Sequence, residues 1–374
     1  MPVLQGVGQH QAAAQLRRGL RGVDRLDWIH ALPWLAAAAA LGAAGAWLAR
    51  AHALRHGLLD LPGERRSHQV PTPRGGGVGI AVAWVLACVL SGWSGWMPWE
   101  LALAAGCGSL LVAVAGYIDD HRPLSAWWRL LAHVVAGLVL AAGVSFAGGA
   151  AWLALLAFVA VPVMVNVWNF MDGIDGIATS QAALAAAGIA ALGIASHGEE
   201  GVRAALPALL LCAACLGFLP FNFPRARIFL GDVGSGTLGI ALAVLVVLLL
   251  SDAAPGQGAG LLVLACLPLS AFLVDATLTL GGRIVSREQW WTAHVGHAYQ
   301  RLARRTGSHV PVAFAYAGWT AVAVLAALAA SGSGFIVKLA VCAGFVAAGI
   351  LVWRASTGAD ARTHEETPDD DQPE

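Results

Sequence analysis

Long apolar blocks of about 20 residues, separated by short polar joints, constrain this chain more than any other feature of its sequence. An α-helix needs about 20 apolar residues to cross the hydrocarbon core of a bilayer. Lipid offers the backbone no hydrogen-bond partners, so segments inside it form helices. We therefore predict an all-α fold, a polytopic transmembrane helical bundle with about 11 spans (10–11). The expected spans are residues 28–49, 75–92, 99–117, 127–147, 151–167, 179–196, 204–221, 235–251, 259–278, 310–330 and 335–353.

The composition agrees with a membrane protein. Of the 374 residues, 58% are hydrophobic and only 12% are charged, whereas a soluble domain carries about 25% charged residues. The formal net charge is zero, which argues against a nucleic-acid-binding surface. Three regions are expected: a polar N-terminal segment (1–27), a transmembrane domain (28–353) and an acidic, disordered tail (354–374).

Two kinds of loop alternate along the chain. One kind is short and nearly free of charge, and the other is longer and contains most of the 22 Lys and Arg residues. The positive-inside rule places the basic loops in the cytoplasm. Four N-terminal arginines, at positions 17, 18, 21 and 25, fall on the opposite side and are the exception.

The first basic loop reads DLPGERRSHQVPTPRGGGVG over residues 60–79. Arg65, His68 and Arg74 flank a Pro-Thr-Pro turn and three glycines. Cationic side chains suit phosphate, and glycines let a backbone approach a ligand closely. The pattern favours phosphate binding, although an ordinary positive-inside loop has the same composition.

Asp119 and Asp120 end the third expected span, in the sequence GYIDDHRPLSAWWRL. Adjacent carboxylates repel each other unless they share a cation or a proton. Carboxylate oxygens are hard ligands of the kind that Mg²⁺ prefers. The pair is a candidate metal site, and the alternative is a solvated turn.

Amide and carboxyl side chains recur every third residue in NVWNFMDGIDGIA, at Asn166, Asn169, Asp172 and Asp175. On a helix this spacing places them along one side. Polar groups at the end of an apolar span are candidates for function because their burial is costly. We expect this motif to form part of a ligand site.

A fourth motif reads FNFPRARIFLGDVGSGTLG and contains Asn222, Arg225, Arg227 and Asp232 just before an apolar span. The free N–H groups at a helix N-terminus favour anions. The motif is therefore a candidate anion site, and for Asp232 the alternative is a helix cap without a further role.

His294 and His297 form an HxxH pair in AHVGHAYQRLARR. A zinc pair has this spacing, but no third Cys or His lies nearby at zinc spacing. We favour a role in phosphate or nucleotide binding, with Arg301, Arg304 and Arg305 adding charge. A basic amphipathic helix on the membrane surface is the alternative.

Taken together, the five motifs resemble those of the polyprenyl-phosphate N-acetylhexosamine-1-phosphate transferases, the family that includes the phospho-MurNAc-pentapeptide translocase. The resemblance covers about residues 55–310, in the same order. The histidine loop looks most like that of the O-antigen-initiating branch. This chain departs from the family pattern at His133, where relatives often have Gln, and in having two loop histidines where other branches have three.

The resemblance implies a site for Mg²⁺, with Mn²⁺ as a substitute, held by Asp232, Asp119 and Asp120. It implies catalytic roles for Asp119, Asp120 and Asp172. Substrate contacts are implied for a larger set: Arg65, His68, Arg74, Asn166, Asn169, Asp175, Asn222, His294 and His297.

The implied substrates are a UDP-N-acetylhexosamine and undecaprenyl phosphate, with UMP as the leaving group. The implied setting is the bacterial inner membrane, with a cytoplasmic active site, membrane lipid around it and a possible homodimer. The reaction would start a surface polysaccharide such as O-antigen.

Two other functions fit parts of the pattern. A transporter or flippase of a lipid-linked or nucleotide-linked sugar would place polar residues at the bilayer midplane, on broken helices. A CDP-alcohol phosphotransferase also uses Asp and Mg²⁺ on lipids, but the sequence after DGIDGIA lacks the long motif of that class. The clustering of carboxylates at span ends favours the transferase.

Overall fold

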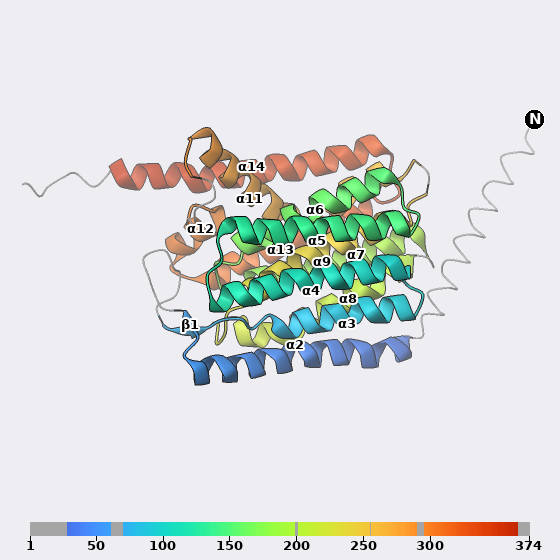
Figure 1. The fold of residues 1–374 in the computed structure, drawn as a ribbon. Helices are drawn as coiled ribbons and strands as arrows, with labels where there is room; N and C mark the ends of the chain where they lie inside the picture. The colour runs from blue at the N-terminus through green and yellow to red at the C-terminus, as the bar shows by residue number, and fades with distance from the viewer. Residues whose placement is uncertain (1–27, 61–69, 199–200, 255, 290–294, 366–374) are drawn as a thin grey trace, which may run out of the picture.

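The computed structural model describes residues 28–60, 70–198, 201–254, 256–289 and 295–365. Long helices run side by side through this part of the chain and form one bundle (Figure 1). Nine of the described helices are long and apolar enough to cross a membrane. They are α2 (Trp28–His56), α4 (Trp99–His121), α5 (Ala126–Phe146), α6 (Ala151–Phe170), α7 (Ile177–His197), α8 (Gly201–Asn222), α9 (Gly231–Ser251), α13 (His309–Ala329) and α14 (Phe335–Glu365).

The other two expected spans have their own geometry. Helix α3 (Val78–Trp93) is apolar but shorter. The span expected at 259–278 is broken into α10 (Gly258–Cys266) and α11 (Ser270–Val285), which meet at an angle of 78°. Pro268 lies in the break, where its ring and missing N–H interrupt a helix. With α3 and the bent pair included, every predicted span corresponds to helix.

The centre of the bundle is α9. Each of its residues from Val233 to Leu250 is buried, and it packs against α3, α4, α6, α7 and α8. A helix that is hydrophobic all round is expected in such a position. Small residues allow close packing there: a Cβ on Gly239 would lie 2.5 Å from the Cα of Val165 on α6.

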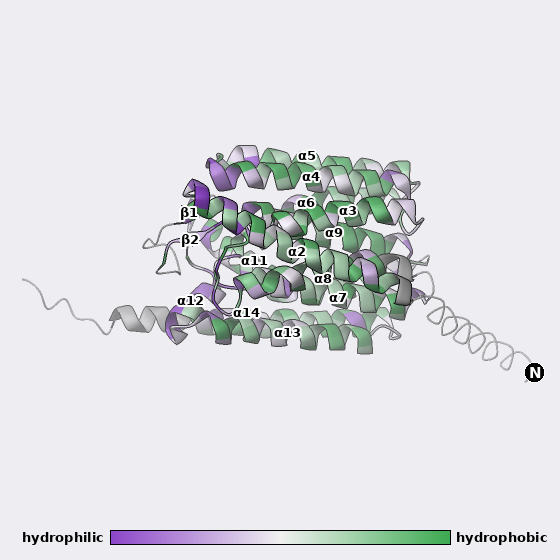
Figure 2. Ribbon diagram, turned by 90° about the horizontal axis from the view of Figure 1, so that it is seen from below, coloured by the Kyte–Doolittle hydropathy of each residue, from purple (hydrophilic) through white to green (hydrophobic). Residues whose placement is uncertain are grey.

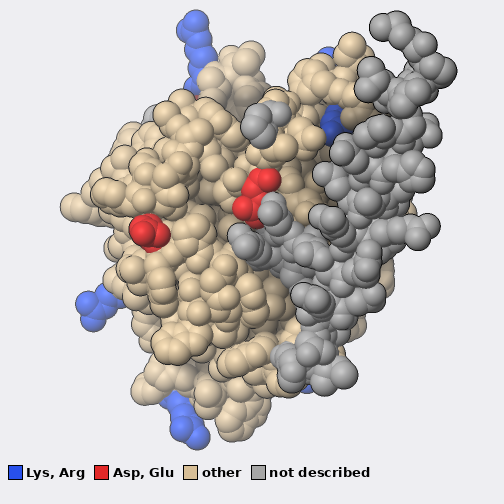
Figure 3. Space-filling model, turned by 90° about the vertical axis from the view of Figure 1, so that its right-hand side faces the viewer, with Lys and Arg blue, Asp and Glu red and all other residues tan. Residues whose placement is uncertain are grey.

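The two ends of the bundle differ in polarity. The most hydrophilic stretches gather at the end with the short ribbon β1 (Leu59–Asp60) and β2 (Thr72–Pro73) and with helix α12 (Ala298–Thr306) (Figure 2). The opposite end shows only scattered charged side chains on its visible surface (Figure 3). The helices with their apolar lengths and polar ends make the chain a multi-pass membrane protein.

The chain after the last span is partly helical. Helix α14 extends to Glu365, into the segment that we expected to be a disordered tail from residue 354. The rest of that tail, and the polar N-terminal segment, lie outside the described residues. Helix α12 is short and amphipathic, and it lies beside α13 and α14 rather than forming a span.

Candidate active site

Residues from all five motifs line one cavity at the polar end of the bundle. The motifs lie far apart in the sequence, and the alternation of spans brings their loops to one end, as the sequence predicted. The lining residues are Asp60, Arg74, Asp120, Asp172, Gly173, Ile174, Asp175, Asn222, Phe229, Leu230, Gly231, Asp232, Gln300 and His309. The fifth motif contributes Gln300, whereas Arg65, His68 and His294 lie outside the described residues.

The glycines of the first motif serve backbone packing. The backbone N–H groups of Gly76 and Gly77 donate to the carbonyl oxygens of Phe229 and Leu230, at 2.9 and 2.8 Å. A Cβ on Gly77 would lie 2.2 Å from the Cα of Gly234. The expected close approach is therefore between the first and fourth motifs, and it forms one wall of the cavity.

Asp120 caps the N-terminus of α9. Its carboxylate accepts the backbone N–H groups of Asp232, at 3.0 Å, and Val233, at 3.2 Å. These are two of the donors that a helix leaves unpaired in its first turn. The structure thus gives the capping role, which we had considered for Asp232, to Asp120. Each Asp120 oxygen accepts one backbone N–H, and the residue also lines the cavity, so its predicted metal-ligand role stays a prediction.

Asp119 and Asp232 face a shared cation, Arg129 at the start of α5. The Arg129 guanidinium lies 3.2 Å from an Asp119 oxygen and 3.4 Å from an Asp232 oxygen. The other Asp232 oxygen accepts the Asn169 amide at 2.9 Å. The side chains of three helices, α4, α5 and α6, thus meet at the first turn of α9.

Gly116 sets the distance between α4 and α9. A Cβ at this position would lie 2.5 Å from the backbone carbonyl of Asp232. The lack of a side chain lets α4 run directly against the start of α9. One turn later along α4, Asp119 and Asp120 are consequently within reach of Asp232 and its backbone.

Asp172 is a cavity carboxyl group without a hydrogen-bond partner among the described residues. Within the described part of the chain, no group donates a hydrogen bond to its side chain. Burial, and then the charges of Asp120 and Asp175, raise the pKa of Asp172 to about 7. Desolvation and like charges both disfavour the ionised form. A carboxyl group in this state is suited to accept a proton near neutral pH.

The helical register expected for the third motif holds only for its first half. Helix α6 ends at Phe170, so Asn166 and Asn169 are helical whereas Asp172 and Asp175 lie in a turn. Gly176, with φ of +74°, begins the next helix. A side chain there would be strained, and its Cβ would lie 2.7 Å from the Phe223 ring.

Asp175 and Asn222 connect the turn to the fourth motif. Asp175 accepts the backbone N–H of Ala226 at 3.2 Å and lies 3.3 Å from the His309 ring. Asn222 accepts the N–H of Gly176 at 2.9 Å and donates to the carbonyl of Ile228 at 3.0 Å. Asn222 is 3% exposed, and its amide connects two segments of the cavity wall. It also lines the cavity, so the predicted substrate contact stays a prediction.

Asn166 lies away from the cavity wall. Its amide donates to the Pro162 carbonyl at 2.7 Å and contacts the His133 ring at 3.3 Å. Together with Arg129 and Phe170 it lines a recess that reaches Asp232. The same three residues also line a larger apolar groove between α5, α6 and α11. The groove walls include Trp127, Leu130, Pro162, Val163, Leu280 and Ile284.

The donor set decides what cation fits. The described residues contain no group of three or more His, Cys, Asp or Glu side chains in metal-binding geometry. Asp232 offers a carboxylate at the cavity, and Asp119 and Asn169 lie beside it with a carboxylate and an amide. Such a set fits Mg²⁺, which binds proteins through one or two carboxylates and fills its other positions with water and substrate phosphates. A closed zinc site does not fit it.

Comparisons with known proteins agree on one family. Residues 102–250 match the model of the family described as glycosyl transferase family 4. The chain is 34% identical over 237 residues to decaprenyl-phosphate N-acetylglucosaminephosphotransferase of Mycolicibacterium smegmatis, covering 57% of this chain and 58% of that protein. It is 32% identical over 244 residues to phospho-N-acetylmuramoyl-pentapeptide-transferase of Heliobacterium modesticaldum, covering 58% of this chain and 72% of the relative. The chain belongs to glycosyl transferase family 4.

A third relative extends the comparison. The family 4 chain is 28% identical over 271 residues to the probable undecaprenyl-phosphate N-acetylglucosaminyl 1-phosphate transferase of Bacillus subtilis, covering 69% of this chain and 73% of that protein. The chain spans between 52% and 58% of the length of the four decaprenyl-phosphate relatives that it matches. The resemblance found in the motifs is therefore confirmed at the level of the family.

The described histidine of the fifth motif has an unexpected partner. His297 is 2% exposed, and its ring lies 3.6 Å from Asp275 of α11. The cavity lining does not include it. Arg301, expected to add charge for a ligand, is turned toward α14, where it contacts Ser356 and the Trp353 ring. In this family 4 protein His297 and Arg301 are thus engaged within the fold, whereas Gln300 of the same motif lines the cavity.

Sequence reasoning missed several residues of the site. Arg129 stands near the start of an apolar span, and Asp275 stands inside one. A charge at such a position is a functional candidate by default, so both signals were present in the sequence. Gln300 and His309 line the cavity but resemble ordinary loop-flanking residues. Gly116 is one of 45 glycines, and the sequence contains no signal that sets it apart.

Proposed function

We propose that this protein transfers N-acetylhexosamine-1-phosphate from a UDP-sugar to a polyprenyl phosphate, releasing UMP. One observation supports this most: Arg129 lines both the apolar groove and the recess beside Asp232. A lipid lying in the groove would thus bring its phosphate to a cation beside the carboxylates. The printed names of the relatives support the same reaction class.

The polar cavity is suited to the nucleotide sugar. Arg74 lines it and is held by an ion pair with Asp60 at 3.0 Å. Cationic groups neutralise pyrophosphate, and neutralisation is required before a second anion attacks it. Asp119 and Asp232 would hold Mg²⁺, which when bound supplies charge neutralisation for the phosphates. Activity should accordingly depend on Mg²⁺ or Mn²⁺.

The chemistry is a displacement at phosphorus. An oxygen of the polyprenyl phosphate attacks the phosphorus that carries the sugar, and the bond from that phosphorus to the bridging oxygen breaks. UMP leaves with the bridging oxygen. Asp172 has a raised pKa and receives no side-chain hydrogen bond from the described residues, and it would take the proton of the lipid phosphate monoanion, whose pKa lies near 6.

Attack by Asp172 itself, through a covalent phosphosugar intermediate, is the alternative route. Exchange of labelled UMP into UDP-sugar without any lipid acceptor separates the two. Single displacement predicts no exchange until polyprenyl phosphate is added.

The proposed setting is the bacterial inner membrane, with the polar end of the bundle in the cytoplasm. The charge difference between the two ends supports this orientation. The product would start a cell-surface polysaccharide such as O-antigen.

The decisive experiment uses membranes, undecaprenyl phosphate and a panel of labelled UDP-N-acetylhexosamines. Transfer is expected to place the label in the lipid fraction with an equal release of UMP, and excess UMP should reverse the reaction. A sugar transporter would instead move the label across the membrane without releasing UMP. Absence of labelled lipid with every donor would refute the proposal.

A further inference from the structure

A second buried carboxylate lies near the cavity without lining it. Asp275 of α11 is 4% exposed, and its oxygens accept four hydrogen bonds. Two come from the backbone N–H groups of Ala298, at 2.9 Å, and Tyr299, at 3.1 Å, which begin α12. The others come from Thr279, at 3.1 Å, and the Tyr316 hydroxyl, at 2.7 Å. Asp275 thus holds the N-terminus of α12 against α11 and α13.

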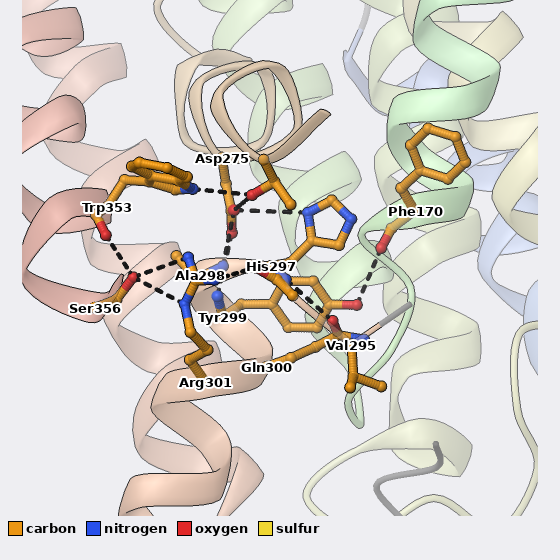
Figure 4. Close-up of polar contacts among 12 residues, drawn as sticks. Phe170, Asp275, Val295, His297, Ala298, Tyr299, Gln300, Arg301, Trp353 and Ser356 are labelled. Carbon is orange, nitrogen blue, oxygen red and sulfur yellow. Dashed lines mark hydrogen bonds and ion pairs between the residues drawn. The ribbon is translucent and has the colours of Figure 1, made fainter. Parts of the chain in front are cut away.

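The far side of α12 is also fixed (Figure 4). Arg301 donates to the Ser356 hydroxyl, at 3.3 and 3.4 Å, and stacks over the Trp353 ring. Trp353 in turn donates to Thr279, which donates to Asp275. These contacts close a ring of hydrogen bonds around α12, so the helix has little freedom to shift.

Tyr299 extends from α12 to the turn that contains Asp172. Its hydroxyl donates to the backbone carbonyl of Phe170 at 3.0 Å, and in Figure 4 the ring points from α12 toward that carbonyl. A Cβ on Gly173 would lie 2.1 Å from the Tyr299 oxygen and 3.0 Å from the Gln300 amide. The turn at 171–173 therefore rests on the Tyr299 and Gln300 side chains of α12, and Gly173 leaves room for them.

A chain of contacts consequently runs from Asp275 to the free carboxyl group of the cavity. Asp275 holds the backbone of Tyr299, and the Tyr299 hydroxyl holds the carbonyl two residues before Asp172. Asp172 receives no hydrogen bond of its own within the described chain. Its position is set by its backbone, and its backbone rests on Tyr299.

We propose that Asp275 is a positioning residue, which places Asp172 through Tyr299 and the N-terminus of α12. The effect on turnover rests on the proposed transferase function, whereas the effect on the geometry of the turn does not. Misplacement of a reacting group by about 1 Å lowers a rate by roughly a hundredfold. Asp275→Asn, which removes the charge at the start of α12, should lower kcat by about that factor.

Two tyrosines provide a matched comparison. Tyr299→Phe and Tyr316→Phe each remove one hydroxyl from a buried ring. The Tyr316 hydroxyl donates to Asp275, and the Tyr299 hydroxyl donates to the Phe170 carbonyl. Only Tyr299 reaches the Asp172 turn. Tyr299→Phe should lower kcat about tenfold and leave KM for both substrates near the wild-type values. Tyr316→Phe should reduce the melting temperature to a similar degree and keep wild-type turnover.

The physical readout is hydrogen–deuterium exchange of the full-length protein in detergent, followed by mass spectrometry. We expect faster exchange in the peptide covering residues 170–176 in Asp275→Asn and Tyr299→Phe, but not in Tyr316→Phe. Unchanged exchange there, or an equal increase in all three variants, would overturn the positioning role. If the wild-type protein transfers no sugar, the proposed function fails, and the exchange data still decide whether Asp275 positions the turn.

Discussion

Two groups of carboxylates lie at the polar end of the bundle, one half-buried and one buried, and they differ in how their oxygens are used. In the open group, Asp119, Asp172 and Asp232, the last two line the cavity, and Asp119 shares the Arg129 guanidinium with Asp232. No described residue donates a hydrogen bond to the Asp172 side chain. The closed group consists of Asp275 alone, with four hydrogen bonds and a neighbouring histidine. A carboxylate whose oxygens are satisfied by the fold stabilises structure, whereas one left unsatisfied at a cavity is available for a ligand.

The strongest test of this comparison is Asp232→Asn. Loss of the charge between Arg129 and the proposed cation should lower kcat by about a thousandfold, because charge stabilisation at phosphorus is the main catalytic device in such a site. Turnover is measured with labelled donor in detergent. The control is Glu100→Gln at the opposite end of α4, where an exposed carboxylate is replaced in the same way. Near-normal turnover in Asp232→Asn would remove this residue from the chemistry.

Asp172→Asn sharpens the comparison through pH. The pKa of Asp172 is raised from 3.8 to about 7 in the folded protein, so the folded state binds more protons than the unfolded chain between these values. Stability therefore falls as pH rises from about 4 to 7 and levels off above that range. Asparagine does not titrate, so the variant should show a flatter dependence of the melting temperature on pH, in buffer without divalent cations. Parallel curves for the two proteins would contradict the raised pKa.

Asp172→Asn should also reduce turnover by about a hundredfold at neutral pH, since a general base contributes roughly that much. The measurement is the initial rate of transfer with saturating donor and acceptor. A variant with normal turnover would move the proton-accepting role to another group.

Gly116→Ala tests how the open group is assembled. The new Cβ would meet the Asp232 backbone at 2.5 Å, and overpacking of this kind costs about 1–3 kcal/mol. We expect lower thermal stability together with reduced turnover, because α4 carries Asp119 and Asp120 away from α9. Gly106→Ala on the same helix is the control, since its Cβ would meet only Cys88 at 3.8 Å. Equal stability and turnover of the two variants would show that the close contact between Gly116 and the Asp232 backbone does not determine the geometry of the open group.

The smallest expected effect belongs to the closed group. Thr279→Val keeps the shape of the side chain but removes one hydrogen bond to Asp275 and one acceptor for Trp353. The loss should be about 1–2 kcal/mol of stability, with turnover within about twofold of the wild type. A large loss of turnover at normal stability would mean that the two groups are not separate in function.

The sequence predicted the broad architecture because its signals are local. Each apolar block identifies its own helix, and the alternation of the blocks brings the motif loops to one end. The same local signals placed Asp172 and Asp232 in a common site. The break near Pro268 was not predicted: residues 259–278 were expected as one span, and the structure bends them by 78°.

What the sequence did not predict are partners that meet across large separations. Asp120 caps α9 and Asp119 pairs with Arg129, because only Asp120 points to the α9 backbone. Two adjacent aspartates cannot be told apart in this way from the sequence. Asp275 and His297 meet only because α12 folds back onto α11. The last residue of α6, Phe170, accepts a hydrogen bond from Tyr299, which lies more than a hundred residues away.

The complete enclosure of α9 has a consequence for how the protein responds to its bilayer. Lipids of different chain length change the thickness of the membrane, and helices in contact with them tilt or shift to match. Helix α14, whose apolar window is not buried, is exposed to that adjustment. Helix α9 touches protein on all sides, so the height of Asp232 is set by neighbouring helices and not by lipid. We expect a reaction centre that keeps its depth as the membrane thickens or thins.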